Sequence, residues 1–125
     1  WDLMPTLADL AGTVSPNNDG LSFLPALLQA EGQEKHKSLY WEFHNTRGGH
    51  AQAVRFLDDS SKSWKAVRLY NESSDTKAVL ELYDLDNDPG ESMDLAAKNA
   101  KLVEWATKIM DSSRSRSFID AWNFD

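Results

Sequence analysis

Four strand-like segments in the middle of the chain, between Ser38 and Leu85, restrict the fold more than any other feature. They read SLYWEFH, AQAVRFL, WKAVRLY and AVLELYDL, and short polar links separate them. Segments rich in Val, Leu, Phe, Trp and Tyr that alternate with turn residues are typical of consecutive antiparallel strands. We therefore predict a four-stranded antiparallel meander.

Amphipathic helices are expected on both sides of this sheet. Two short ones should lie between Asp2 and Gly12 and between Ser22 and Gly32, because each pair can supply a cap and a stop. After Asn99, which can cap a longer helix, apolar residues recur at helical spacing: Leu102, Val103, Ala106, Ile109 and Met110. The sequence therefore predicts an α+β fold in which a C-terminal helix packs on the sheet.

Alternation along the first two strands predicts which side chains face the core. In the first strand the large residues Leu39, Trp41 and Phe43 share one face, and we expect that face to point inward. In the second strand Arg55 lies on the face opposite to Phe56. The polar residues of the first strand should then lie on its solvent side.

Charge and composition exclude several classes of function. Thirteen Lys and Arg against twenty Asp and Glu give a net charge of -7, which disfavours a nucleic-acid surface. The chain has no cysteine, so disulfides, zinc-thiolate sites and cysteine nucleophiles are excluded. No apolar run approaches the roughly 20 residues that span a bilayer, so we expect no membrane segment.

An acidic run follows the fourth strand and resembles a calcium loop, with carboxylates at Asp84, Asp86, Asp88 and Glu91. The helix-loop-helix calcium pattern requires Gly at its sixth position and Glu at its twelfth, where this chain has Pro89 and Leu95. We therefore interpret the run as a structural turn. The three histidines also lack the spacing of a helical zinc site, so we expect no metal site.

Polar residues gather around the glycine turn that joins the first two strands: Glu42, His44, Arg47, His50, Gln52 and Arg55. Arg and His can donate charge-assisted hydrogen bonds, which suits an anionic or hydroxylated ligand. Ordinary exposed strand-end residues are an equally open interpretation. No Ser-His-Asp arrangement, phosphate loop or helical His-Glu motif is present, so the chain has no self-sufficient catalytic set.

Several motifs, taken in order, resemble the C-terminal part of the type I sulfatases of the alkaline-phosphatase-like superfamily. They are DLMPTLADLAG, DGLSFLPALL, LYWEFH with GGHAQAVRF, WKAVRL and ELYDLDNDPGESMDLA, and the likeness extends to about Met110. That family combines a large α/β domain with a smaller subdomain, a four-stranded antiparallel sheet and a long helix. The resemblance implies that residues 1–35 are terminal helices of the catalytic domain and that residues 36–125 are the subdomain.

The resemblance also implies a function for the parent protein, hydrolysis of sulfuric esters on a sulfated small molecule or glycan. The family's formylglycine, made in a C-x-P-S-R motif, and its calcium ion belong to upstream sequence, and this chain has no such motif. We expect the chain alone to be inactive and to lack catalytic residues. In similar enzymes the loop after the first strand of the small sheet approaches the active site, which suggests His44 as a substrate contact, followed by Arg47, His50 and Gln52.

Two alternatives remain open: a related phosphodiesterase or phosphonate hydrolase, and a stand-alone protein-interaction module. The chain begins with Trp1 rather than Met, which suggests a piece of a longer protein. An apolar stripe separated from a catalytic domain would favour self-association, so we expect a homodimer through Leu3, Leu7 and Leu10. The family's common location suggests a periplasmic or secreted protein, although the chain itself does not indicate a compartment.

Overall fold

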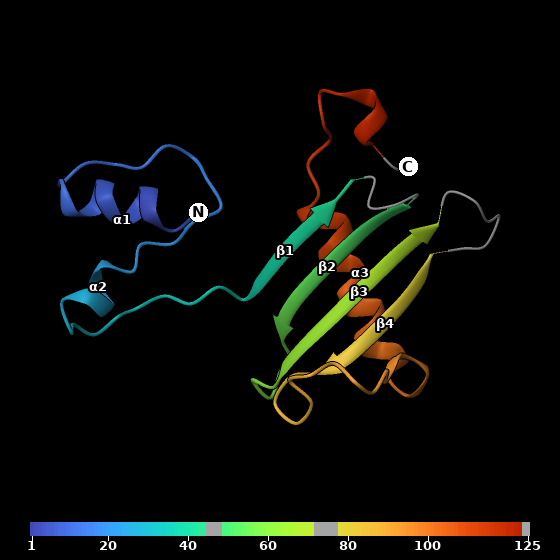
Figure 1. Ribbon diagram of the computed structural model, residues 1–125. Coiled ribbons are helices and arrows are strands. Elements are labelled where there is room, and N and C mark those ends of the chain that lie inside the picture. Colours follow the sequence, from blue (N-terminus) through green and yellow to red (C-terminus); the bar gives the residue numbers. More distant parts are fainter. Residues whose placement is uncertain (45–48, 72–77, 124–125) are drawn as a thin grey trace. The chain divides into compact units, whose positions relative to one another are not determined.

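The computed structural model of the chain describes residues 1–44, 49–71 and 78–123. It divides into two compact units, Trp1–His36 and Lys37–Asp125, and Figure 1 shows the elements of each. Within the described part, no helix has the length and apolar character needed to cross a membrane.

The first unit contains two short helices, α1 (Leu3–Leu10) and α2 (Leu24–Leu27). Gly12 has a φ of 67° and ends α1, as predicted. The amide of Thr13 donates to the carbonyl of Ala8, which together with the left-handed glycine forms a Schellman motif. Only Pro5 and Thr6 of α1 are buried, so most of its apolar stripe is exposed.

Polar side chains join the segments of this unit. The predicted cap at Asp2 is wrong, because its carboxylate makes no bond to α1 and instead accepts a hydrogen bond of 3.0 Å from the amide of Leu21. His36 Nε2 lies 2.8 Å from the same carboxylate oxygen. The predicted stop of α2 at Gly32 is also wrong: Gln29 already has a φ of 54°, so the chain leaves the helix three residues earlier.

The second unit contains the predicted sheet. Its strands are β1 (Ser38–Phe43), β2 (Gly49–Leu57), β3 (Ser63–Asn71) and β4 (Val79–Asp84). All neighbouring strands pair antiparallel in the order β1-β2-β3-β4. The four-stranded meander is therefore confirmed.

The helix α3 (Ala100–Ser113) lies along one face of this sheet, as Figure 1 shows. Val54, Ala66 and Leu82 are cross-strand neighbours and are completely buried under it. Ala106 and Met110 of α3 complete the core from the other side. The predicted apolar stripe thus packs on the sheet, and its burial is the main stabilising contribution to this unit.

The expected inward face of β1 is wrong. Tyr40 pairs with Val54 and packs against the core, whereas Phe43 is 61% exposed. The register across β2 decides this, because the face with Val54 and Phe56 is the one that α3 covers. The polar residues of β1 consequently lie on the same side of the sheet as the core.

Asn99 precedes α3 but does not cap it as predicted. Its side-chain Nδ2 donates to the carbonyl of Leu95, 2.9 Å away, and its side chain makes no hydrogen bond to a backbone amide of the helix. Leu95 follows the last turn of the acidic run, and a short 3₁₀ helix, η1 (Ala96–Lys98), connects it to α3. Asn99 therefore stabilises this connection and leaves the helix N-terminus without a side-chain cap.

Candidate functional site

Polar residues continue the core face of the sheet toward the edge where β1 ends and β2 begins. The register places Glu42 opposite Gln52, and Gln52 opposite Arg68, in the next row after Val54. His50 and Tyr70 form the row beyond. Since side chains two residues apart on a strand share a face, apolar packing changes into a polar cluster toward this edge.

Gln52 is the centre of a buried hydrogen-bond network. It is only 2% exposed, and its Nε2 donates to the hydroxyl of Tyr40 over 2.7 Å. Its Oε1 accepts hydrogen bonds from Arg68 Nη1 at 3.1 Å and from the Tyr70 hydroxyl at 3.0 Å. Arg68 also reaches Asp111 of α3 at 3.2 Å. Gln52 therefore joins strands and helix, and its amide is occupied by protein partners.

A second chain of contacts connects β1 to the segment after α3. Burial raises the pKa of Tyr40, and the hydrogen bond that its hydroxyl donates to Glu42 Oε2 over 2.6 Å raises it further. The same carboxylate oxygen lies 3.6 Å from Arg114 Nε. Tyr40 thus stays protonated and acts as a hydrogen-bond donor at neutral pH.

The two predicted histidines lie together at the end of the sheet. The ring centroids of His44 and His50 are 4.4 Å apart, with their planes tilted by 31°. On another side of His44, the ring of Trp122 has its centroid 6.0 Å away. His44 Nδ1 is buried, and it has no hydrogen-bond partner in the described part of the chain. Leaving such a group unpaired costs about 1–3 kcal/mol, so this atom needs an explanation.

Two other members of the predicted cluster do not join this group in the structure. Arg47 lies outside the described residues. Arg55 is on the opposite face of the sheet, where its Nε donates to Ser63 Oγ at 3.2 Å. The structure therefore brings together Glu42, His44, His50 and Gln52, and it separates Arg55 from them.

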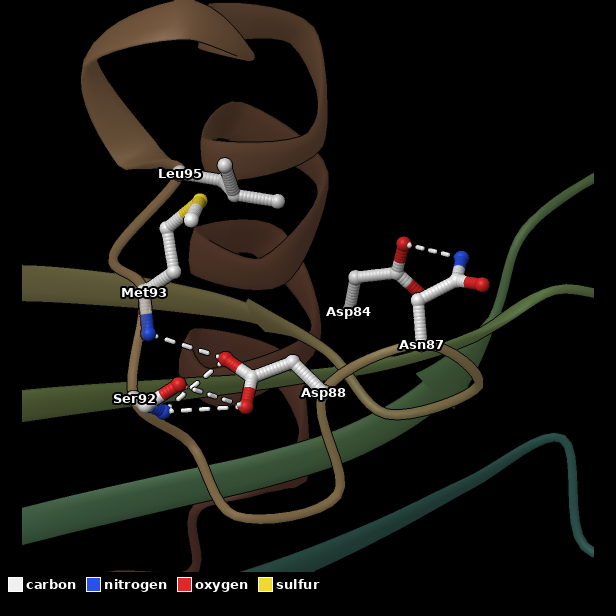
Figure 2. Close-up of a pocket in the computed structure, with 6 residues that line it drawn as sticks. All are labelled: Asp84, Asn87, Asp88, Ser92, Met93 and Leu95. Atoms are coloured by element: carbon white, nitrogen blue, oxygen red, sulfur yellow. Dashed lines mark hydrogen bonds between the residues drawn. The ribbon is translucent and has the colours of Figure 1, made fainter.

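The turn after β4 forms a pocket of about 280 Å³, lined by Asp84, Asn87, Asp88, Ser92, Met93 and Leu95. Figure 2 shows that the carboxylates of Asp84 and Asp88 point to different partners. Asp88 accepts hydrogen bonds from the amides of Ser92 and Met93, both at 2.9 Å. Asp84 accepts one from Asn87 Nδ2 at 2.8 Å and lies 2.6 Å from Lys62 Nζ.

These contacts pair Asp88 and one oxygen of Asp84 with protein groups, as expected for a structural turn. Hydrogen bonds to the backbone amides of Ser92 and Met93 lower the pKa of Asp88. The bond from Asn87 and the ion pair with Lys62 lower the pKa of Asp84. Among the described residues, no group of three or more His, Asp or Glu side chains could hold a metal ion.

The fold and these motifs match a known family model. The model describes the C-terminal part of N-sulphoglucosamine sulphohydrolase, and it matches residues 1–115. The chain belongs to this family. The resemblance to sulfatases noted in the sequence is therefore confirmed at family level.

A sequence relative and several solved structures are also similar to this chain. A Delta 4,5-hexuronate-2-O-sulfatase of Bacteroides thetaiotaomicron is 28% identical over 119 residues, which is 93% of this chain and 23% of the relative. The chain thus spans about a quarter of the length of this relative.

Solved structures show the same fold. A protein of Bacteroides thetaiotaomicron described as a sulfatase is 23% identical with a TM-score of 0.64, covering 99% of this chain and 28% of the other. A protein solved with its substrate D-glucosamine-2-N,6-O-disulfate is 22% identical with a TM-score of 0.64, covering 90% of this chain and 23% of the other. At these identities the likeness supports the fold alone.

Sequence reasoning missed two residues of the candidate site, Trp122 beside His44 and Arg114 beside Glu42. Both come from the segment after α3, which is far from the glycine turn in sequence. The aromatic residues of this polar segment were the available signal, because exposed aromatics in a tail suggest docking on a neighbouring surface. The sequence did not indicate which surface.

Proposed function

We propose that the chain is the C-terminal part of a sulfatase and that its sheet end contributes His44 and His50 to the pocket for a sulfated substrate. The sulphohydrolase family membership supports the reaction class. The names of two relatives, one a hexuronate sulfatase and one bound to a glucosamine disulfate, favour a sulfated sugar over other sulfate esters. Residues 1–35 would then extend the catalytic domain, and residues 36–125 would form the accessory subdomain.

One observation carries the pocket role. His44 Nδ1 is buried without a partner in the described residues, whereas the neighbouring side chains Gln52, Tyr40 and Glu42 are hydrogen-bonded to one another. Buried polar atoms are nearly always paired, so an exception suggests a partner outside the described residues. A hydroxyl or sulfate oxygen of a bound sugar is such a partner, and an imidazole can bond it in either protonation state.

Gln52 has a different role in this proposal from the one the sequence suggested. Its side-chain amide is already hydrogen-bonded to Tyr40, Arg68 and Tyr70. Gln52 would therefore stabilise the sheet next to the histidines instead of contacting the substrate. Arg47 stays a prediction as a substrate contact. Its guanidinium would suit a sulfate group, since arginine binds oxyanions with two parallel hydrogen bonds.

The catalytic groups would come from elsewhere in the intact enzyme. The described residues do not fit the family's calcium ion, because they offer no suitable group of His, Asp or Glu. The chain also has no C-x-P-S-R sequence to supply a formylglycine. The chemical step would therefore lie outside this chain, and we expect the chain alone to release no sulfate from a sulfated sugar.

Replacement of His44 tests the pocket role. In the intact enzyme, His44→Ala should lower kcat/KM on the natural sulfated sugar about tenfold to a hundredfold, the range for a hydrogen bond to a charged group. His44→Gln should recover part of the loss because an amide also forms hydrogen bonds. Lys108→Gln, on the exposed face of α3, is the control. An unchanged kcat/KM in His44→Ala would remove the proposed contact.

The same assay separates the two enzyme classes. A sulfatase should hydrolyse a sulfate ester much faster than the matching phosphate or phosphonate ester. The opposite preference would favour a related phosphodiesterase or phosphonate hydrolase. If the chain is instead a protein-interaction module that does not contact the sugar, His44→Ala should leave hydrolysis of both kinds of ester unchanged.

The exposed leucines of the first unit support a further part of this proposal. Leu3, Leu7, Leu10, Leu27 and Leu28 are all more than half exposed, and we expect them to cover a surface of the catalytic domain in the intact enzyme. In the isolated chain they should instead promote dimers. Light scattering at high concentration should show a dimer that Leu7→Glu dissociates, and a monomeric unsubstituted chain would contradict this.

A further inference from the structure

The segment after α3 folds into a closed loop whose side chains hold one another. Asn123 Oδ1 accepts a hydrogen bond of 2.9 Å from the amide of Ser117, and its Nδ2 donates to the carbonyl of Ser117 at 3.0 Å. Within the loop, the short 3₁₀ helix η2 (Asp120–Trp122) brings the amide of Trp122 to 2.9 Å from the carbonyl of Ile119. These bonds give Trp122 a defined position.

Arg114 connects this loop to the first strand. Its Nη2 lies 3.4 Å from Asn123 Oδ1, and its Nε lies 3.6 Å from Glu42 Oε2. Figure 1 shows the loop beside the end of the sheet where β1 finishes and β2 begins. The loop is thus fixed at two points, the end of α3 and the carboxylate of Glu42.

Trp122 places an aromatic surface beside His44. Its ring centroid is 6.0 Å from that of His44, with the planes tilted by 38°, and the residue is 49% exposed. A tryptophan held by a folded loop against an imidazole, with half of its surface open to solvent, offers a flat apolar face next to polar groups. The apolar faces of sugar rings pack on such surfaces, because burial of both faces removes apolar area from water.

The family boundary adds an independent observation. The sulphohydrolase family model ends at residue 115, so the loop that carries Trp122 lies beyond the part that the model describes. A residue beside the candidate site but beyond the range that the family model matches suits a role in choosing the substrate, since surface loops on a rigid scaffold often carry such differences.

We propose that Trp122 is a specificity-determining residue, an apolar platform on which a sugar ring of the substrate packs while His44 bonds a polar group of the same ligand. The proposal rests on the pocket role of His44 given above. It assigns the loop 116–123 to selection among sulfated glycans and gives it no part in the chemical step.

The test uses the intact enzyme and two substrates, a sulfated disaccharide and a sulfated straight-chain alcohol without a ring. Trp122→Ala should raise KM for the disaccharide about fivefold, within the range of a single aromatic contact, and leave kcat unchanged. It should leave the kinetics on the alkyl sulfate unchanged. Trp122→Phe should recover most of the disaccharide KM because it keeps a flat ring. Phe118→Ala is the control, since Phe118 belongs to the same loop and is 94% exposed.

The outcomes separate this proposal from the pocket role. If Trp122→Ala behaves like Phe118→Ala while His44→Ala loses activity, the platform is wrong and the pocket role stands. If Trp122→Ala raises KM equally for both substrates, Trp122 stabilises the site as a whole and does not select the substrate. This result would also overturn the proposed platform. If His44→Ala is silent, the pocket role itself fails. Circular dichroism of each variant confirms that the fold is retained.

Discussion

Different kinds of interaction stabilise the two units of the chain, residues 1–36 and residues 37–125. All the buried hydrophobic residues of the core cluster belong to the second unit. In the first unit the buried residues are Pro5 and Thr6, and the segments are joined by polar contacts of Asp2 and Thr6. The first unit therefore depends on a few hydrogen bonds, and the second depends on the removal of apolar area from water.

This difference shows what an amphipathic pattern can and cannot predict. The stripes of α1 and α3 look alike in sequence, since each has apolar residues at helical spacing. The stripe of α3 is covered by the sheet, whereas Leu3, Leu7 and Leu10 of α1 are exposed. A pattern therefore predicts the helix and the existence of an apolar face, but the surface that covers this face is a separate question.

The largest expected difference between the units comes from one substitution made in each. Leu82→Ala should reduce the free energy of unfolding of the second unit by about 3–5 kcal/mol, because Leu82 is completely buried in the core. Leu7→Ala, at a residue that is 61% exposed, should change stability by less than about 0.5 kcal/mol. Urea unfolding monitored by circular dichroism measures both. Similar losses in the two variants would contradict the contrast between the units.

A smaller effect is expected where the first unit relies on a hydroxyl. Thr6 Oγ1 donates to the carbonyl of Asp2 at 2.7 Å and accepts from the amide of Phe23 at 3.0 Å. Thr6→Val keeps the shape of the side chain but leaves the amide of Phe23 unpaired. The free energy of unfolding of this unit should therefore fall by about 1–3 kcal/mol. Hydrogen exchange should become faster at Phe23 and stay unchanged at Val54 of the second unit.

The matched control is Thr107→Val in α3. The hydroxyl of Thr107 donates to the carbonyl of Val103, 2.8 Å away on the preceding turn, and such bonds stabilise a helix little. Exchange rates in α3 should therefore hardly change. If Thr6→Val also left the exchange rate at Phe23 unchanged, the hydrogen bonds of Thr6 could not be what stabilises the first unit.

The sequence predicted the sheet because its signals are local. Alternation within each strand and turn residues between strands are both properties of short segments, and they give the strands, their order and the covering helix. The prediction for the inward face of β1 was wrong because both faces carry large side chains, Leu39, Trp41 and Phe43 on one and Tyr40 on the other. Register against Val54 decides between them, and register is a property of two strands together.

The candidate site divides in the same way. In the sequence His44 and His50 flank the predicted glycine turn between two strands, so their proximity could be predicted from that pattern alone. The burial of Gln52 could not, because it depends on Arg68 and Tyr70 of β3. The contact of Trp122 with His44 depends on a loop after α3, and no local pattern connects these two positions.

The smallest expected effect concerns acid, where the two units should differ in the number of sensitive groups. In the first unit the hydrogen bond from the amide of Leu21, together with the contact to His36, lowers the pKa of Asp2 below its usual 3.8. A lowered pKa stabilises the fold above the usual value, and this contribution is lost as the pH falls through the lowered pKa. Asp2→Asn should therefore remove the dependence of the protection factor of the Leu21 amide on pH below about 4. Asp58, Asp84 and Asp88 also have lowered pKa values, so the second unit of this variant should still lose stability in acid. If the protection factor of Leu21 kept its pH dependence in Asp2→Asn, a group other than this carboxylate would have to be the acid-sensitive contact of the first unit.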